Sequence, residues 1–362
     1  MKTLVLAEKP SVGRDLAAVL RCNEAGKGYI EGSDCIVTWA IGHLVGLADP
    51  ELYDGKYKSW DIADLPIMPD FMKLVVLPST KEQFNVIKML MQRDDVGNLV
   101  IATDAGREGE LIARYIMTLA GWRKPFTRLW ISSLTEEAIK DGFKALRPGR
   151  EYDRLYQAAA ARSEADWLVG MNATRAYTTK FRALLTVGRV QTPTLAMIVK
   201  REHEIQKFVS QPFWTLTIDL GQFQAKWFNP ESKDVKILDK QLAEQIQKQV
   251  NGAVAEVTDV TSEVKQRPHP LLYDLTELQR EANRYFGFTA KKTLGIAQEL
   301  YEKHKLITYP RTDSRHISND MVSTLPGRLH VLSAGPYGKL AQQLLEKMPA
   351  LDKRTVDDTK IS

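Results

Sequence analysis

Cysteine is scarce in this sequence: only Cys22 and Cys35 occur among its 362 residues. Two widely spaced cysteines are too few for a zinc site and do not indicate a disulfide framework, so a reducing compartment is expected. The sequence also lacks an apolar run long enough to cross a bilayer. Its opening MKTLVLA resembles a signal peptide, but Glu8 and Lys9 end the apolar run too early. The sequence therefore excludes a disulfide-rich secreted domain and a membrane-spanning protein.

The remaining composition is that of a folded globular protein with two or three domains. Hydrophobic residues make up 44% of the chain and charged residues 26%, which is ordinary for such a protein. The formal net charge is +5 at pH 7. A mildly basic balance permits a polyanionic partner without requiring one.

An apolar run followed by acidic residues lies in the N-terminal half. Residues 99–102 predict a buried strand, and the residues after Gly106 predict a helix with one apolar face. The joint between them carries Asp104, Arg107, Glu108 and Glu110. In an open parallel sheet, ligands bind beyond the carboxyl ends of the strands, and carboxylates there suit a magnesium ion that also holds a phosphate. An equally weighted alternative is that these acids only cap the helix and complement its dipole.

The first strand of the chain ends in the same way. Residues 3–7 predict a buried strand, Glu8 and Lys9 follow it, and residues 12–20 predict a helix. Two such units in one doubly wound sheet would bring Glu8 and Asp104 side by side. A solvated turn is the alternative for the Glu8-Lys9 pair considered alone.

Strands and helices alternate through residue 146, which predicts an α/β domain over residues 1–150, with a parallel sheet flanked by helices. Within it, residues 49–71 predict a long irregular excursion, whose aromatic residues either stack on bases or pack the loop down. Long helices predict a helical segment over 151–212. Alternating residues at 213–220, 225–228 and 253–264 predict a small mixed β region over 213–268. A helical domain is predicted over 269–362.

The run from Leu185 to Pro193 joins two predicted helices. Gly188 allows close approach of a backbone, while Thr186, Arg189 and Gln191 offer hydrogen-bond donors to phosphates. The alternative is a plain turn with Pro193 at the first helical position.

The run LITYPRTDS, at 306–314, contains a tyrosine and an arginine two residues apart. Because a residue before proline is pushed toward extended conformations, Tyr309 and Arg311 are expected to project from the same face. A nearby guanidinium favours the phenolate and binds phosphate, which a nucleophilic tyrosine needs. Considered alone, such a loop is more often structural.

Five short runs match the motifs of a known family, in that family's order. They are AEKPS at 7–11, TDAGREGE at 103–110, TVGRVQTP at 186–193, LYDLTELQ at 272–279 and LITYPRTDS at 306–314. On these motifs the chain resembles the type IA DNA topoisomerases and, among them, the bacterial topoisomerase III group. The resemblance covers nearly the whole chain.

The resemblance implies a Toprim domain at the N-terminus and a catalytic tyrosine on a helical domain that faces its acids. Tyr309 would attack a phosphodiester of single-stranded DNA, forming a 5′-phosphotyrosine and freeing a 3′ hydroxyl. No nucleotide cofactor is implied, in agreement with the lack of a GxxxxGK[ST] loop. Glu8 would act as acid or base at the 3′ oxygen, and Lys9 and Arg311 would stabilise phosphate charge. The implied Mg²⁺ ligands are Glu8, Asp104 and Glu108.

The resemblance also implies contacts with a DNA strand. The residues concerned are Trp60, Arg162, Asp166, Trp167, Arg175, Thr186, Val187, Gly188, Arg189, Val190, Gln191, Gln279 and Arg311. The implied substrates are single-stranded DNA and negatively supercoiled or catenated DNA, which strand passage would relax or decatenate. The same resemblance implies a cytoplasmic, nucleoid-associated monomer with no membrane partner, and leaves a helicase partner open.

The chain departs from the family pattern in two places. The usual Asp-x-Asp-x-Glu acids lose their second aspartate to Gly106, so one functional Mg²⁺ is expected. Family members also continue well beyond Ser362, so a truncated protein that cannot close the ring for strand passage is expected. Two rival functions follow: a catalytically inert module that binds single-stranded DNA, and a Toprim nuclease that uses only the acids.

Overall fold

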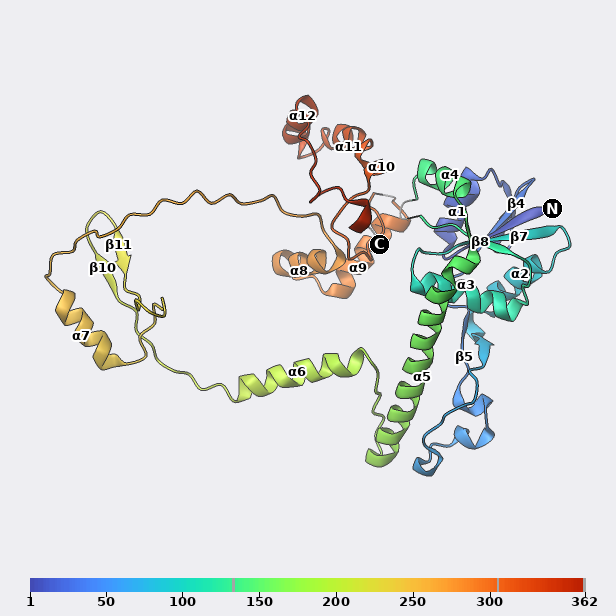
Figure 1. Cartoon of the computed structure of the whole chain (residues 1–362), viewed down its shortest axis with the longest axis horizontal. Coiled ribbons are helices and arrows are strands. Elements are labelled where there is room, and N and C mark those ends of the chain that lie inside the picture. The colour runs from blue at the N-terminus through green and yellow to red at the C-terminus, as the bar shows by residue number, and fades with distance from the viewer. Residues whose placement is uncertain (132–133, 305, 361–362) are drawn as a thin grey trace. The chain divides into compact units, whose positions relative to one another are not determined.

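The computed structural model describes residues 1–131, 134–304 and 306–360. The chain forms two compact units (Figure 1). The first unit comprises Met1–Gly188 and His269–Ser362, and the second comprises Arg189–Pro268. The first unit contains both the predicted acids and the predicted tyrosine.

A seven-stranded sheet forms the centre of the first unit, with the strand order β2-β3-β4-β1-β7-β8-β9. Its four central strands are parallel, namely β4 (Cys35–Trp39), β1 (Lys2–Ala7), β7 (Val96–Ala102) and β8 (Phe126–Arg128). Three short strands pair antiparallel at the edges, namely β2 (Glu24–Gly26), β3 (Tyr29–Glu31) and β9 (Arg147–Pro148). The predicted parallel sheet is confirmed for its centre, and the whole sheet is mixed.

Helices cover both faces of this sheet, because successive side chains of a strand point to opposite faces. On β1, Leu4 and Leu6 enter one hydrophobic cluster, while Val5 and Ala7 enter another. Helices α2 (Lys81–Met91) and α3 (Arg107–Ala120) pack on the first cluster. Helices α1 (Pro10–Val19) and α4 (Glu136–Lys144) pack on the second. The predicted strands are apolar on both sides because both sides are covered.

Helix α5 (Asp153–Phe181) leaves this core and supports the irregular excursion. Its first turns pack on α3, where the rings of Tyr115 and Tyr156 meet edge to face at 6.3 Å. The excursion follows β5 (Val45–Leu47), contains the 3-10 turns η1 (Pro50–Leu52), η2 (Gly55–Lys58) and η3 (Ile62–Asp64), and returns through β6 (Leu74–Val76). It lies beside the later turns of α5 (Figure 1).

Three side chains of α5 fasten the excursion, namely Trp167, Asn172 and Arg175, and the first two are described here. The indole of Trp167 donates to the carbonyl of Ala48 at 3.0 Å. The amide of Asn172 bonds both the N–H of Ile67, at 2.5 Å, and its carbonyl, at 2.9 Å. These bonds satisfy backbone groups that an irregular segment cannot pair within itself.

The second unit is small. It contains α6 (Gln191–Gln206), a hairpin of β10 (Thr217–Asp219) and β11 (Gln224–Lys226), and α7 (Lys240–Val250). The prediction of a strand over 253–264 was wrong. This segment is irregular, and the side chains of Val254 and Val260 are 98% and 82% exposed. The alternation of apolar and polar residues is not enough for a strand here, because this segment pairs with no other strand within the described residues.

The C-terminal part of the first unit is helical, as predicted. It contains α8 (Leu275–Phe286), α9 (Ala290–Glu302), α10 (Asn319–Val322), α11 (Leu325–Leu332) and α12 (Gly338–Glu346). Helix α8 is capped by Asp274, whose carboxylate accepts the N–H of Glu277 at 2.7 Å. Across the described residues, no helix has the length and apolar character needed to span a membrane.

The predicted division into 1–150, 151–212, 213–268 and 269–362 remains a prediction, and the compact units are bounded differently. Helix α5 belongs to the first unit and α6 to the second, with the boundary after Gly188. The reason is that α5 packs on α3, through Ala159 in the cluster beneath the sheet.

Replacing Asn172 with Ala should loosen the excursion. The variant leaves the buried N–H and carbonyl of Ile67 without their partner, which costs about 1–3 kcal/mol. Urea denaturation should show this loss, and limited proteolysis should cut faster within residues 49–72. Val169→Ala, on an exposed side chain of the same helix, is the matched control and should change stability by less than about 0.5 kcal/mol. Equal rates of proteolysis for both variants would contradict the role of Asn172 in holding this segment.

Candidate active site

Two carboxylates meet at the carboxyl ends of β1 and β7. Ala7 and Ala102 are register partners in these parallel strands, so the residues that follow them are neighbours. The carboxylate of Glu8 accepts the backbone N–H of Asp104 at 3.0 Å. Burial, and then the negative charge of Asp104, raise the pKa of Glu8. The structure thus brings together two of the three predicted metal ligands.

Lys9 connects this acidic pair to the predicted nucleophile. Its ammonium donates to the Asp104 carboxylate at 3.3 Å and lies 4.1 Å from the centroid of the Tyr309 ring. Burial acts to lower the pKa of Lys9, but the Asp104 carboxylate and a hydrogen bond with Tyr309 outweigh it, so this pKa is raised. Lys9 therefore keeps its positive charge at neutral pH and lies between Asp104 and Tyr309. The ring of Tyr301, at the end of α9, meets that of Tyr309 edge-on at 5.4 Å.

A buried ion pair holds the turn that carries Asp104. Glu110 and Arg128 are both fully buried, and the guanidinium donates to the Glu110 carboxylate at 3.0 Å. The same guanidinium donates to the carbonyls of Thr103, at 2.8 Å, and Asp104, at 2.7 Å. Arg114 donates to the other oxygen of Glu110 at 2.8 Å. Glu110 is therefore a structural acid, distinct from the two at the sheet edge.

The two glycines of the TDAGREGE run differ in their surroundings. A Cβ on Gly109 would lie 2.2 Å from the carbonyl oxygen of Asp104, so only glycine fits there without a shift of the backbone. A Cβ on Gly106 would meet nothing within 4 Å, and the backbone there is extended, with φ at −173°. The position of the family's second aspartate is thus open to a side chain.

Glu108, the third predicted metal ligand, contacts His43. It lies in the first turn of α3, and its carboxylate is 2.6 Å from the Nε2 atom of His43. Across the described residues, no three carboxylates, histidines or cysteines are placed to hold a metal ion. The structure places Glu8 beside Asp104 and the Glu108 carboxylate beside His43. That these three carboxylates bind one metal ion remains a prediction.

The donor set nevertheless suits Mg²⁺. Two adjacent carboxylates repel each other, and after burial the charge of Asp104 is the next cause of the raised pKa of Glu8. Mg²⁺ in proteins commonly takes one or two carboxylates together with phosphate oxygens and water. Glu8 and Asp104 would therefore hold the ion, with a DNA phosphate completing its shell.

A cavity of about 370 Å³ adjoins this site. His43, Arg107 and Glu108 line its sheet side, and α5 contributes the predicted DNA contacts Arg162 and Asp166. Its lining contains both the basic side chains Arg107 and Arg162, which suit a phosphate, and the acidic Glu108 and Asp166.

Other predicted DNA contacts have partners inside the protein. Trp167 donates to Ala48, as described above, and Arg175 donates to the carbonyl of Tyr57 at 2.7 Å. The guanidinium of Arg175 also lies 5.0 Å from the ring centroid of Trp60, which is 40% exposed. Trp60 thus presents a partly exposed ring with a cation behind it, while Arg175 and Trp167 fasten the excursion.

The predicted contacts between residues 186 and 191 straddle the boundary of the two units. Thr186 is exposed, Val187 bonds the hydroxyl of Thr174 at 2.9 Å, and Gly188 ends the first unit. Arg189, Val190 and Gln191 belong to the second unit. Their place relative to the acids therefore remains a prediction.

The last two predicted contacts lie on the helical part of the first unit. Gln279 donates to the carbonyl of Ala290 at 3.1 Å, which joins α8 to the start of α9. Arg311 is exposed, two residues after Tyr309. Its role in phosphate binding remains a prediction.

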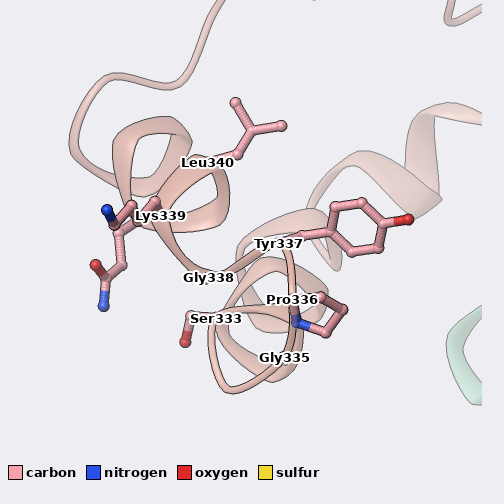
Figure 2. A pocket seen from close by; sticks show the side chains of 8 residues that line it. Ser333, Gly335, Pro336, Tyr337, Gly338, Lys339 and Leu340 are labelled. Carbon is pink, nitrogen blue, oxygen red and sulfur yellow. The ribbon is translucent and has the colours of Figure 1, made fainter.

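A larger depression of about 550 Å³ lies at the turn between α11 and α12 (Figure 2). It is lined by Ser333, Gly335, Pro336, Tyr337, Gly338, Lys339, Leu340 and Gln342. Figure 2 shows Tyr337 and Lys339 pointing in opposite directions rather than toward a common centre. Its lining contains no carboxylate or histidine, so it offers less chemistry than the site at the sheet edge.

Sequence reasoning missed His43 and Arg128. A signal existed for His43, because it follows the apolar run that forms β4, a parallel neighbour of β1, and so lies at the same sheet edge as Glu8. Arg128 ends β8 and is buried, where an arginine is rare unless it is paired.

Comparisons with known proteins agree with this geometry. A family model described as "Toprim domain" matches residues 3–134, and one described as "DNA topoisomerase" matches residues 150–360. The Toprim sheet and the tyrosine beside its acids define a DNA topoisomerase of the type IA class, and the chain belongs to that family.

Among its curated relatives are proteins named DNA topoisomerase 3. The one from Bacillus subtilis (strain 168) is 52% identical over 361 residues, covering 100% of this chain and 50% of the relative. The one from Bacillus cereus (strain ATCC 10987 / NRS 248) is 52% identical over 362 residues, with the same coverage. The solved structure of full-length topoisomerase I from Thermotoga maritima matches with a TM-score of 0.62 and 26% identity, covering 91% of this chain and 52% of that one. The chain spans about half the length of the curated relatives it matches.

Gly109→Ala and Gly106→Ala form a matched pair that tests the turn. The first should cost about 1–3 kcal/mol, because its methyl group meets the Asp104 carbonyl. The second should change stability by less than about 0.5 kcal/mol, since its methyl group enters open space. Urea unfolding of both variants measures the difference. Equal stabilities would show that the turn tolerates a shift of Asp104.

Proposed function

We propose that this chain carries the DNA-cleaving centre of a type IA topoisomerase, in which Tyr309 forms a reversible covalent bond with single-stranded DNA. One observation carries the proposal: Lys9 contacts both the Asp104 carboxylate and the Tyr309 ring. Asp104 and Tyr309, about 200 positions apart in the sequence, thus meet around the Lys9 ammonium. A nuclease that uses only the acids has no need of this tyrosine.

The residues support a transesterification. The Tyr309 hydroxyl loses its proton to water, its oxygen bonds to the phosphorus, and the bond from phosphorus to the 3′ oxygen breaks. Glu8, whose pKa is raised by burial and by Asp104, would supply a proton to the leaving 3′ oxygen. Lys9 and Arg311 would stabilise the negative charge on the phosphate. Rejoining is the reverse reaction, in which the 3′ hydroxyl attacks the phosphotyrosine.

Mg²⁺ held by Glu8 and Asp104 would supply positive charge beside the phosphate. Glu108, whose carboxylate lies 2.6 Å from Nε2 of His43, is the third residue that would hold the ion. The cavity lined by His43, Arg162 and Asp166 would receive the adjoining nucleotide.

The substrates proposed for the whole protein are negatively supercoiled and catenated DNA, relaxed or decatenated by strand passage. Cleavage and rejoining of a single strand form the part of this cycle that the described residues carry.

A covalent-trapping assay tests the proposal. Labelled single-stranded oligonucleotide, chain and Mg²⁺ are mixed, denatured and run on a gel. A protein-linked band is expected for the unaltered chain and should be absent for Tyr309→Phe, which keeps the ring contact with Lys9 but lacks the nucleophile. Tyr301→Phe is the matched control, since it removes a neighbouring hydroxyl and should retain the band. Strand binding without an adduct would instead favour an inert binding module, and metal-dependent cutting that survives Tyr309→Phe would favour a nuclease.

Gly106→Asp tests the single-metal expectation. The site around Gly106 has room for the side chain, so the variant should fold and should bind Mg²⁺ several-fold more tightly, because it adds a carboxylate. Isothermal titration with Mg²⁺ measures this affinity. Gly106→Asn, of equal size but uncharged, should leave it unchanged. An equal affinity for all three proteins would place residue 106 outside the metal site.

A further inference from the structure

The only two cysteines of the chain lie in contact, although they were too widely spaced in sequence to indicate a bridge. Their Sγ atoms are 2.7 Å apart, and both are free thiols. A disulfide needs a separation of about 2.05 Å, so a small movement of the side chains suffices to close it.

The backbone on both sides is already fixed. The N–H of Cys22 bonds the carbonyl of Ala17 at 2.8 Å, which ties it to the end of α1. Cys35 is the first residue of β4 and the register partner of Thr3 on β1. Gly32, whose N–H bonds the Cys35 carbonyl at 2.8 Å, leaves room for the sulfur atoms, since a Cβ there would lie 3.1 Å from the Cys22 sulfur.

The two thiols differ in access. Cys22 is 4% exposed and packs in the cluster beneath α1, whereas Cys35 is half-buried. Burial, and then the hydrogen bond with Cys35, raise the pKa of Cys22 to about 12. A reagent from solution therefore meets Cys35 first.

We propose that Cys22 and Cys35 form a reversible redox site, which closes to an intramolecular disulfide by exchange with a small disulfide such as oxidised glutathione. The Cys35 sulfur attacks one sulfur of the reagent and releases one glutathione thiol, leaving a mixed disulfide on Cys35. The Cys22 thiol then loses its proton, its sulfur bonds to that of Cys35, and the second glutathione leaves as a thiol. Two protein thiols are oxidised and one glutathione disulfide is reduced.

The bond would tie the end of α1 to the start of β4. Cys35 begins its strand, whereas Glu8 follows the last residue of β1, so the sulfur pair lies at the end of the sheet opposite the acids. A disulfide there would therefore affect the stability of the fold, and this role does not depend on the proposed cleavage chemistry. Because a cross-link restricts the unfolded chain, oxidation should raise the thermal midpoint by about 5 °C or more.

The folded chain is treated with oxidised glutathione, then denatured, alkylated and weighed as an intact protein. The expected product has lost two hydrogen atoms, carries no alkyl group, yields a linked Cys22–Cys35 peptide and reverts with dithiothreitol. Cys22→Ser should stop at a glutathione adduct on Cys35, and Cys35→Ser should remain unmodified. Cys22→Ala and Cys35→Ala replace either variant that fails to show a native circular-dichroism spectrum.

Several results would overturn the proposal. In one, the unaltered chain keeps a glutathione adduct on Cys35 and forms no disulfide with Cys22. In another, both thiols can still be alkylated. In the third, the disulfide joins two chains. Oxidation that leaves the thermal midpoint unchanged would remove the stabilising role.

Discussion

The geometry of the candidate site depends on the buried ion pair of Arg128 and Glu110. Both side chains are fully buried, and an unpaired charge at such a position would be costly. The planar guanidinium has five donors, enough to pair the carboxylate and also the carbonyls that β7 leaves unpaired at its end. The turn that presents Asp104 is thereby fixed by the protein itself. The pairing of Glu8 with the Asp104 turn therefore needs no bound ion to form.

The parts of this site that could be predicted from the sequence follow from periodicity. Apolar runs ending in Glu8 and Asp104 predicted two parallel strands, and in a parallel sheet such ends are neighbours. The same periodicity could have separated Glu108 from Glu110. Residues two apart lie on opposite sides of a helix, so one of them faces solvent when the other faces the core. Glu110 is the buried one.

The remainder could not be predicted, because it depends on partners that have no signature in a sequence. Trp167 and Arg175 look like ligands for a nucleic acid, yet each donates to a backbone carbonyl more than a hundred residues away. The acceptors are the carbonyls of Ala48 and Tyr57. Because every residue has a backbone carbonyl, nothing in the sequence marks these two residues as acceptors. The pairing of Glu108 with His43 likewise depends on which side chains the folded sheet edge brings together.

The two halves of the site lie far apart along the chain, and this sets the order in which the chemistry is assembled during synthesis. Domains generally fold as units with the N-terminal one first, and roughly 200 residues between Glu110 and Tyr309 take roughly 10–40 s to synthesise. The strands and the ion pair that place Glu8 and Asp104 all precede residue 149, and α5, which packs on α3, ends at Phe181, well before Tyr309. The acids therefore form a finished surface while the nucleophile is still unmade. A ribosome-bound chain would therefore present the pair of Glu8 and Asp104 long before Tyr309 is made.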